Sequence, residues 1–269
     1  MEAPAPTRST TRRTAIPAAA SAALRPLLAP APVPGRVLGA NRAVIWLEAG
    51  DECIVIERRG IGLPNGVTTT ADLPDVPAVG TPAEIGDLEI RIGAGAVSVS
   101  RWWDPRPHLP PADAGALARA FARLDPAEAD DAGLEAALSA RHRPSVAGSA
   151  RSLVGRGDGL TPAGDDVLAG VIATLRLVRA PDAAMLADLL IPPVLDAAET
   201  RTTLLSRSLL RHAAAGRVAL PVADLFAALT GSGDPIGSFR RLLSMGHSSG
   251  PALAAGINIG LRVLAGGEA

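Results

Sequence analysis

Hydrophobic and polar residues alternate with a period close to two from Val37 to Arg101. Such alternation is typical of strands that bury one face. The runs that follow it most closely are AVIWLE (43–48), ECIVIER (52–58), LEIRI (88–92) and VSVSRW (97–102). Short turns join the first run to the second and the third to the fourth, so the pattern predicts two β-hairpins. The segment between the hairpins is rich in Gly and Pro, and we expect it to be a long surface connection.

Beyond the proline-rich residues 104–113, the apolar residues change to helical spacing. The spacing predicts helices over residues 112–124, 126–141, 162–179, 183–190, 194–215, 222–229, 236–244 and 251–264. Strands and helices do not alternate along the chain, which argues against a doubly wound parallel sheet. We therefore predict an α+β fold, in which a small N-terminal antiparallel β domain is followed by a mainly α-helical C-terminal domain.

The composition divides the chain into three parts. Residues 1–20 consist mostly of Ala, Pro, Thr and Arg, and we expect them to be a disordered tail. Residues 21–108 form the predicted β-rich domain. Residues 109–269 form the predicted helical domain, which carries two glycine-rich loops.

Charge and cysteine usage exclude several classes of protein. The net charge is −1 and the arginines are scattered, so a nucleic-acid partner is not expected. No apolar run is long enough to cross a bilayer, and we expect no membrane association. Cys53 is the single cysteine, which excludes an intrachain disulfide or a cysteine-based zinc site and fits the cytoplasm.

The sequence contains no lysine. This excludes a Walker-type phosphate loop and Schiff-base chemistry, because both need a lysine side chain. Any bound anion must then be held by arginine, by backbone N–H groups or by a metal ion.

The first glycine-rich loop is GRGDGLTPAGDDVLAG, residues 155–170, which leads into an apolar helical run. Thr161 suits the N-cap of that helix, and the proline after it suits the first helical position. A helix cap does not explain the glycines at positions Gly157, Gly159 and Gly164. A glycine inside a first turn costs about 0.5–1 kcal/mol relative to alanine, so Gly164 indicates close approach of another backbone or of a ligand.

Asp165 and Asp166 fall in the first turn of the same predicted helix. Helical spacing places Asp165 on the same face as Leu168 and Ile172, which should pack inward. A carboxylate on such a face needs a partner, which is an arginine, a backbone N–H group or a metal ion.

The second loop, GHSSG, runs from Gly246 to Gly250 and has the same construction, since an apolar helix follows it. Helix N-termini preceded by glycines offer N–H groups and the positive end of the helix dipole, which is the physical basis of anion binding. His247, Ser248 and Ser249 add side-chain donors beside them.

GHSSG also fits the nucleophile-elbow pattern of α/β-hydrolases. That elbow follows a strand and precedes an acid and then a histidine in the chain. Here the preceding FRRLLSM has helical character and no histidine follows, so a hydrolase is excluded.

A third polar cluster contains Thr203 and Ser206 in the helical stretch ETRTTLLSRSLLRHAAAG. Most hydroxyls on such a helix bond the carbonyl one turn back or face water. Both residues are therefore candidates for contacting an anion, and the alternative is that their hydroxyls only bond the helix backbone or water.

Together, GRGDGLTPAGDDVLAG, TTLLSRSLLRHAAAG and GHSSGPALAAGINIGL resemble a bacterial family long classed as a domain of unknown function. That family includes the AllH subunit of oxamate carbamoyltransferase, from anaerobic allantoin degradation, a route of purine catabolism. The resemblance extends from about Gly155 to Leu261. It implies that oxalurate and phosphate are converted to oxamate and carbamoyl phosphate by an enzyme with several subunits, and it supplies no catalytic residues.

We therefore expect the two loops to hold a small anionic substrate and phosphate, with other protein subunits as partners. His247 is the candidate for polarising or protonating the substrate, with Ser248 and Thr161 among the hydrogen-bond donors. Asp165 and Asp166 would orient an arginine or hold a divalent cation such as Mg²⁺, the one cofactor considered.

Two alternatives stay open. One is a non-catalytic assembly or regulatory subunit of such a complex. The other is a metal-dependent enzyme that acts on another small carboxylate or phosphate.

Overall fold

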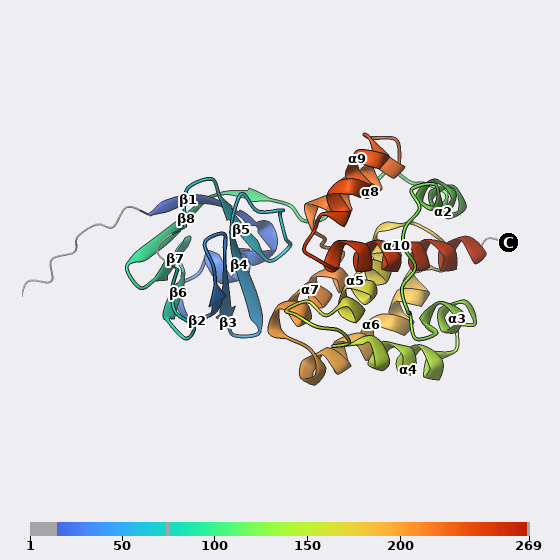
Figure 1. The fold of residues 1–269 in the computed structure, drawn as a ribbon, viewed down its shortest axis with the longest axis horizontal. Helices are drawn as coiled ribbons and strands as arrows, with labels where there is room; N and C mark the ends of the chain where they lie inside the picture. Colours follow the sequence, from blue (N-terminus) through green and yellow to red (C-terminus); the bar gives the residue numbers. More distant parts are fainter. Residues whose placement is uncertain (1–14, 74–75, 268–269) are drawn as a thin grey trace, which may run out of the picture.

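Strands of the N-terminal part close into a β-barrel, which lies beside a helical part (Figure 1). The computed structural model describes residues 15–73 and 76–267. Around the barrel the order is β1 (Ile16–Ser21), β5 (Gly66–Thr69), β4 (Glu52–Arg58), β3 (Val44–Ala49), β2 (Val33–Ala40), β6 (Pro82–Gly86), β7 (Glu89–Ile92) and β8 (Gly95–Trp103). Strands β1 and β8 pair in parallel, as do β4 and β5, and the other neighbours pair antiparallel.

The predicted small antiparallel β domain is therefore wrong, although the structure is α+β overall. The two predicted hairpins exist as the antiparallel pairs β3–β4 and β7–β8. Strands β1, β2, β5 and β6 were not predicted, and β5 and β6 lie within the expected surface connection. These strands are short or contain Gly and Pro, so their own residues favour strands weakly. Pairing with strands elsewhere in the chain decides their conformation.

Strand β1, except for Ser21, lies in the segment that the composition assigned to a disordered tail. Residues 1–14 of that tail are outside the described residues. Strand β1 pairs with β5 on one side and with β8 on the other, so it closes the barrel.

Strand β4 is buried on both of its faces. Ile54 and Ile56 belong to the barrel core, whereas Cys53 and Val55 point outward and pack against Leu205. A continuous apolar run such as CIVI is what a strand buried on both faces requires. The outer face of β4 is therefore the place where the barrel meets the helices.

The helical part follows β8. Its helices are α2 (Ala114–Ala122), α3 (Leu134–Ser139), α4 (Arg143–Leu153), α5 (Ala163–Leu177), α6 (Ala183–Arg201), α7 (Leu204–Ala214), α8 (Leu220–Leu229), α9 (Pro235–Leu243) and α10 (Ser249–Gly266), and a further short helix, α1 (Arg25–Leu28), lies within the barrel region. Helix α4 was not predicted. Helix α6 continues through Pro192 and Pro193, where the sequence suggested a break, and the chain breaks instead between α6 and α7. None of the helices among the described residues has the length and apolar character needed to cross a membrane.

Helices α5 and α10 form the centre of the helical part (Figure 1). A Cβ added to Gly256 would lie 2.1 Å from the carbonyl oxygen of Val167, and one added to Gly260 would meet Thr174. Close helix packing therefore requires glycine at both positions. These contacts advance in the same direction along both helices, so the helices run parallel and both N-termini lie at one end.

Helix α7 attaches the helical part to the barrel. The backbone N–H of Cys53 donates to the hydroxyl of Ser208 at 2.9 Å. The guanidinium of Arg211 donates to the carbonyl oxygen of Asp51 at 3.1 Å. Together with the apolar contact of Leu205, these bonds fix the outer face of β4 against α7.

Candidate functional site

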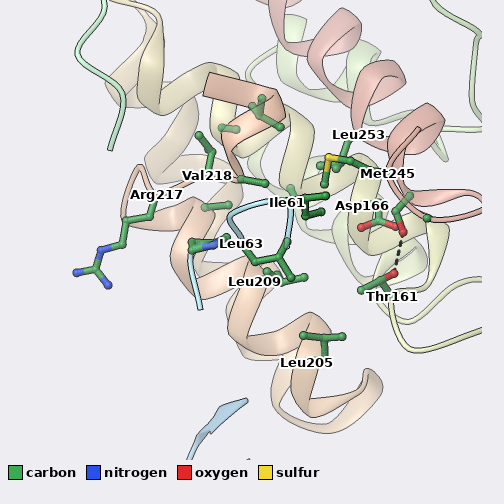
Figure 2. A pocket seen from close by; sticks show the side chains of 18 of the residues that line it. Ile61, Leu63, Thr161, Asp166, Leu205, Leu209, Arg217, Val218, Met245 and Leu253 are labelled. Atoms are coloured by element: carbon green, nitrogen blue, oxygen red, sulfur yellow. Dashed lines mark hydrogen bonds between the residues drawn. The ribbon is translucent and has the colours of Figure 1, made fainter. Parts of the chain in front are cut away.

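The two glycine-rich loops meet at the N-termini of α5 and α10. The hydroxyls of Thr161 and Ser249 are hydrogen-bonded at 2.8 Å (Figure 2). The start of α7 joins them, because the Thr203 hydroxyl donates to the carbonyl oxygen of Leu160 at 2.6 Å. Three segments far apart in the sequence thus form one junction.

Beside this junction a cavity of about 270 Å³ lies between the barrel and helices α5, α7, α8 and α10. Of the candidates named from the sequence, Thr161, Asp166, Gly246 and Ser249 line it. Most other lining residues are apolar: Trp46, Ile61, Leu63, Pro64, Leu160, Ala169, Ala173, Leu205, Leu209, Ala213, Val218, Ala219, Val222, Met245 and Leu253.

Asp166 is the most unusual polar group of this cavity. Its side chain is buried, the residue being 5% exposed, and its Oδ2 atom has no hydrogen-bond partner among the described residues. Burial raises the pKa of Asp166 to about 7; a hydrogen bond from Ser249 opposes the rise, and the charge of Asp165 adds to it. A carboxyl group with such a pKa exchanges protons near neutral pH, as general acids and bases must.

Asp165 has the opposite environment. It is 1% exposed, and its Oδ1 atom accepts a hydrogen bond from the N–H of Gly155 at 2.8 Å. Its Oδ2 atom accepts from the hydroxyl of Ser206 at 2.7 Å and from the hydroxyl of Thr202. The carboxylate therefore joins the first loop, α5 and the start of α7, and both of its oxygens are occupied.

The backbone N–H groups at the two helix N-termini are largely occupied as well. At α5, the N–H of Gly164 donates to the backbone carbonyl oxygen of Arg156 at 2.9 Å. The N–H groups of Asp165 and Asp166 both donate to the carbonyl oxygen of Pro162. At α10, the N–H of Gly250 donates to a carbonyl of the preceding turn. Anion binding by these loops stays a prediction, and these particular N–H groups are not free to provide it.

Close backbone packing explains Gly164 and Gly250. A Cβ on Gly164 would lie 2.1 Å from the carbonyl oxygen of Leu153, and one on Gly250 would lie 2.2 Å from that of Leu242. Of the two explanations offered for Gly164, backbone approach is therefore sufficient. Gly157 and Gly159 are exposed in the turn before α5, with φ values of 114° and 93° that other residues rarely adopt.

The remaining candidates lie away from the cavity. His247 and Ser248 are exposed on the turn before α10 and do not line it. Thr203 caps α7 by accepting from the N–H of Ser206 at 3.1 Å. The N-cap of α5 is Pro162 rather than Thr161, whose hydroxyl bonds Ser249 instead.

Sequence reasoning missed the residues that the barrel and the start of α8 contribute. Trp46 lies on β3, Leu63 lies between β4 and β5, and Arg217 precedes α8. Figure 2 shows Arg217 at the opposite side of the cavity from Asp166, with its guanidinium directed away. Burial lowers the pKa of Arg217, and its Nη1 lies 3.4 Å from Nδ1 of His212. The one available signal was Trp46, an aromatic residue on the outer face of a strand in a chain with few aromatics.

The part of the chain that forms this site matches a known family. Residues 153–261 match the family model described as oxamate carbamoyltransferase subunit AllH. This segment is AllH-like. The match confirms the resemblance expected from the sequence motifs. No curated protein and no solved structure matches the chain.

The AllH-like segment, residues 153–261, contains both loops, α5, α6, α7, α8, α9 and most of α10. The barrel lies outside it, although Trp46, Ile61 and Leu63 of the barrel region complete the cavity. The wall that faces Asp166 is thus built partly by a region that the family match does not cover.

The divalent cation considered as one alternative for Asp165 and Asp166 does not fit the residues present. No cluster of three or more His, Cys, Asp or Glu side chains suited to a metal ion occurs in residues 15–73 and 76–267. Both oxygens of Asp165 already accept hydrogen bonds, which leaves Asp166 without a second carboxylate for Mg²⁺.

Proposed function

We propose that this chain is a subunit of a carbamoyltransferase of the oxamate type, and that Asp166 moves a proton in the reaction. One observation carries the proposal: inside the AllH-like segment, a buried carboxyl group with an unpartnered oxygen lines a cavity. Buried titratable groups with strongly shifted pKa values are concentrated at functional sites.

The chemistry requires such a group. When oxalurate reacts with phosphate, a bond forms between a phosphate oxygen and the carbamoyl carbon. The bond from that carbon to the nitrogen of the oxamate portion breaks, and this nitrogen takes up a proton. Asp166 in its protonated form delivers the proton, and in the reverse direction its carboxylate accepts it. Its pKa of about 7 makes both forms accessible near neutral pH.

Other groups position the reactants. In this proposal Thr161 and Ser249 act as hydrogen-bond donors beside Asp166, since all three line the cavity. His247 and Ser248 do not line the cavity, and in this proposal they and the backbone N–H groups of Gly157 and Gly159 contact an anion at the protein surface. Partner subunits complete the phosphate site.

The test uses the enzyme assembled with its partner subunits and measures phosphate-dependent cleavage of oxalurate. We expect Asp166→Asn to lower kcat by roughly 100-fold or more, because a general acid contributes about 10²–10⁴. The limb of the kcat profile near pH 7 should disappear in this variant. His247→Ala is compared in parallel, and Asp188→Asn, an exposed aspartate on α6, is the matched control. Unchanged activity of Asp166→Asn would end the proposal.

A second candidate is a non-catalytic assembly subunit. It is favoured by the internal hydrogen bonds of Asp165 and by the close packing of Gly164, both of which support a structural role for the first motif. In that case the complex requires this chain for assembly, while the variants at Asp166 and His247 assemble and retain full activity.

A further inference from the structure

The walls of the cavity are more apolar than a small carboxylate or a phosphate requires. Apart from the junction residues Thr161, Asp166, Gly246 and Ser249, Arg217 is the one lining residue without an apolar side chain. Burying a small, strongly hydrated anion against such walls loses its hydration without replacing it. A hydrocarbon group gains from the same burial.

The polar end of the cavity is suited to a hydrogen-bond donor. Asp166 Oδ2 is buried and lacks a donor within the described residues. The neighbouring charge of Asp165 disfavours a ligand anion at this end. Arg217, the other charged residue lining the cavity, directs its guanidinium away from it (Figure 2).

We infer that the cavity binds a neutral amide or ureido compound, whose N–H groups donate to Asp166 and whose hydrocarbon substituent lies against the walls of α5, α7 and α8. This deepens the proposed function and rests on it for the ureido head, since a carbamoyl group carries such N–H donors. The preferred ligand is then a carbamoyl compound with a hydrocarbon substituent, larger and less polar than oxalurate, and oxalurate is expected to bind more weakly.

The size of the cavity agrees with this class. A volume of about 270 Å³ approaches the lower end of small-molecule sites, which is about 300 Å³. Leu205, Leu209 and Val222 also line it, so a chain of several carbons has apolar contacts beyond the head group.

The experiment measures binding to the full chain alone by calorimetric titration at pH 8. The probes are methylurea, butylurea and hexylurea, with octanoate as a carboxylate of similar length and oxalurate as the small polar compound. We expect affinity to rise by roughly fourfold for each added CH₂ until the cavity is filled. Hexylurea should bind at least tenfold more tightly than octanoate.

Variants identify the end that binds the head group. Asp166→Ala should remove the preference for hexylurea over octanoate, whereas Asp188→Ala on the exposed face of α6 should leave it unchanged. Ala169→Met, one turn after Asp166, narrows the cavity and should weaken hexylurea more than methylurea. The dependence of affinity on alkyl length is measured on the unaltered chain. The inference therefore stays testable even if a variant fails to fold.

The outcomes separate this inference from the proposed function. Affinity that is independent of alkyl length, or tighter binding of octanoate than of hexylurea, overturns the inference, even if the assembled enzyme cleaves oxalurate through Asp166. Length-dependent binding through Asp166, with no phosphate-dependent cleavage by the assembled enzyme, supports the inference and ends the carbamoyltransferase proposal.

Discussion

Asp165 and Asp166 are adjacent in the sequence, yet they face two different regions of the molecule. The region around Asp165 is a polar junction, in which Gly155, Thr202 and Ser206 all donate hydrogen bonds to one carboxylate. The region around Asp166 is an apolar cavity that leaves one carboxylate oxygen unpartnered. Identical side chains one position apart on a helix thus serve different purposes, because consecutive positions point about 100° apart. The comparison predicts that substitutions at the two positions have effects of opposite sign on stability.

The largest effect is expected at the polar junction. Asp165→Ala leaves the buried donor of Ser206 and the half-buried donors of Gly155 and Thr202 without their acceptor. Unsatisfied buried groups cost about 1–3 kcal/mol each, so we expect the free energy of unfolding to fall by roughly 4 kcal/mol. Denaturant unfolding monitored by circular dichroism measures the change, with Asp188→Ala as control. A loss below about 1 kcal/mol would mean that Asp165 does not hold the junction together.

Asp166→Asn should have the opposite sign at alkaline pH. The folded-state pKa of Asp166 is raised to about 7, above an unfolded value of about 3.9. The wild-type chain therefore loses stability as the pH rises from about 4 to 7, and the variant lacks this loss. The full shift corresponds to about 4 kcal/mol, and water entering the cavity reduces the expected gain at pH 8 to about 2 kcal/mol.

The measurement is the difference in unfolding free energy between Asp166→Asn and the wild-type chain across this pH range. The two proteins should be nearly equal in stability at pH 4. A difference that does not change with pH would show that burial does not raise the pKa of Asp166. The two aspartates would then differ only in their hydrogen-bond partners.

The smallest effect is expected for Ser249→Ala, at the boundary between the two regions. The substitution removes the partner of Thr161, which costs about 1 kcal/mol or less for a half-buried bond. It also removes the hydrogen bond that lowers the pKa of Asp166. With Ser249→Ala as the background, the difference in unfolding free energy made by Asp166→Asn should therefore have its midpoint at higher pH than in the wild-type background. Ser152→Ala on the exposed face of α4 is the matched control, and it should leave the midpoint in place.

The contrast between the aspartates was only partly predictable. Helical spacing correctly indicated that Asp165 points inward and needs a partner, and the structure supplies backbone and hydroxyl donors. The spacing gave no indication that Asp166 is also buried, because its surroundings come from other segments. Gly246 and Ser249 lie some eighty residues further along the chain, and Ile61 and Leu63 precede it by about a hundred.

The helix boundaries illustrate the same division. The apolar spacing placed α5 and α10 correctly, since both bury a broad face. It failed around α6 and α7, where Pro192 and Pro193 suggested a break. The chain breaks instead at Thr202 and Thr203, because the hydroxyl of Thr202 bonds Asp165 and that of Thr203 caps α7.

Local patterns in the sequence account for the two hairpins, the principal helices and the motifs that match the AllH family model from residue 153 to residue 261. These follow from residues close together in the chain, where periodicity and spacing act directly. The tertiary structure decided the closure of the barrel, the meeting of the two loops and the unlike environments of Asp165 and Asp166. Each of these depends on pairing or burial between distant segments, and no local pattern records which segments will meet.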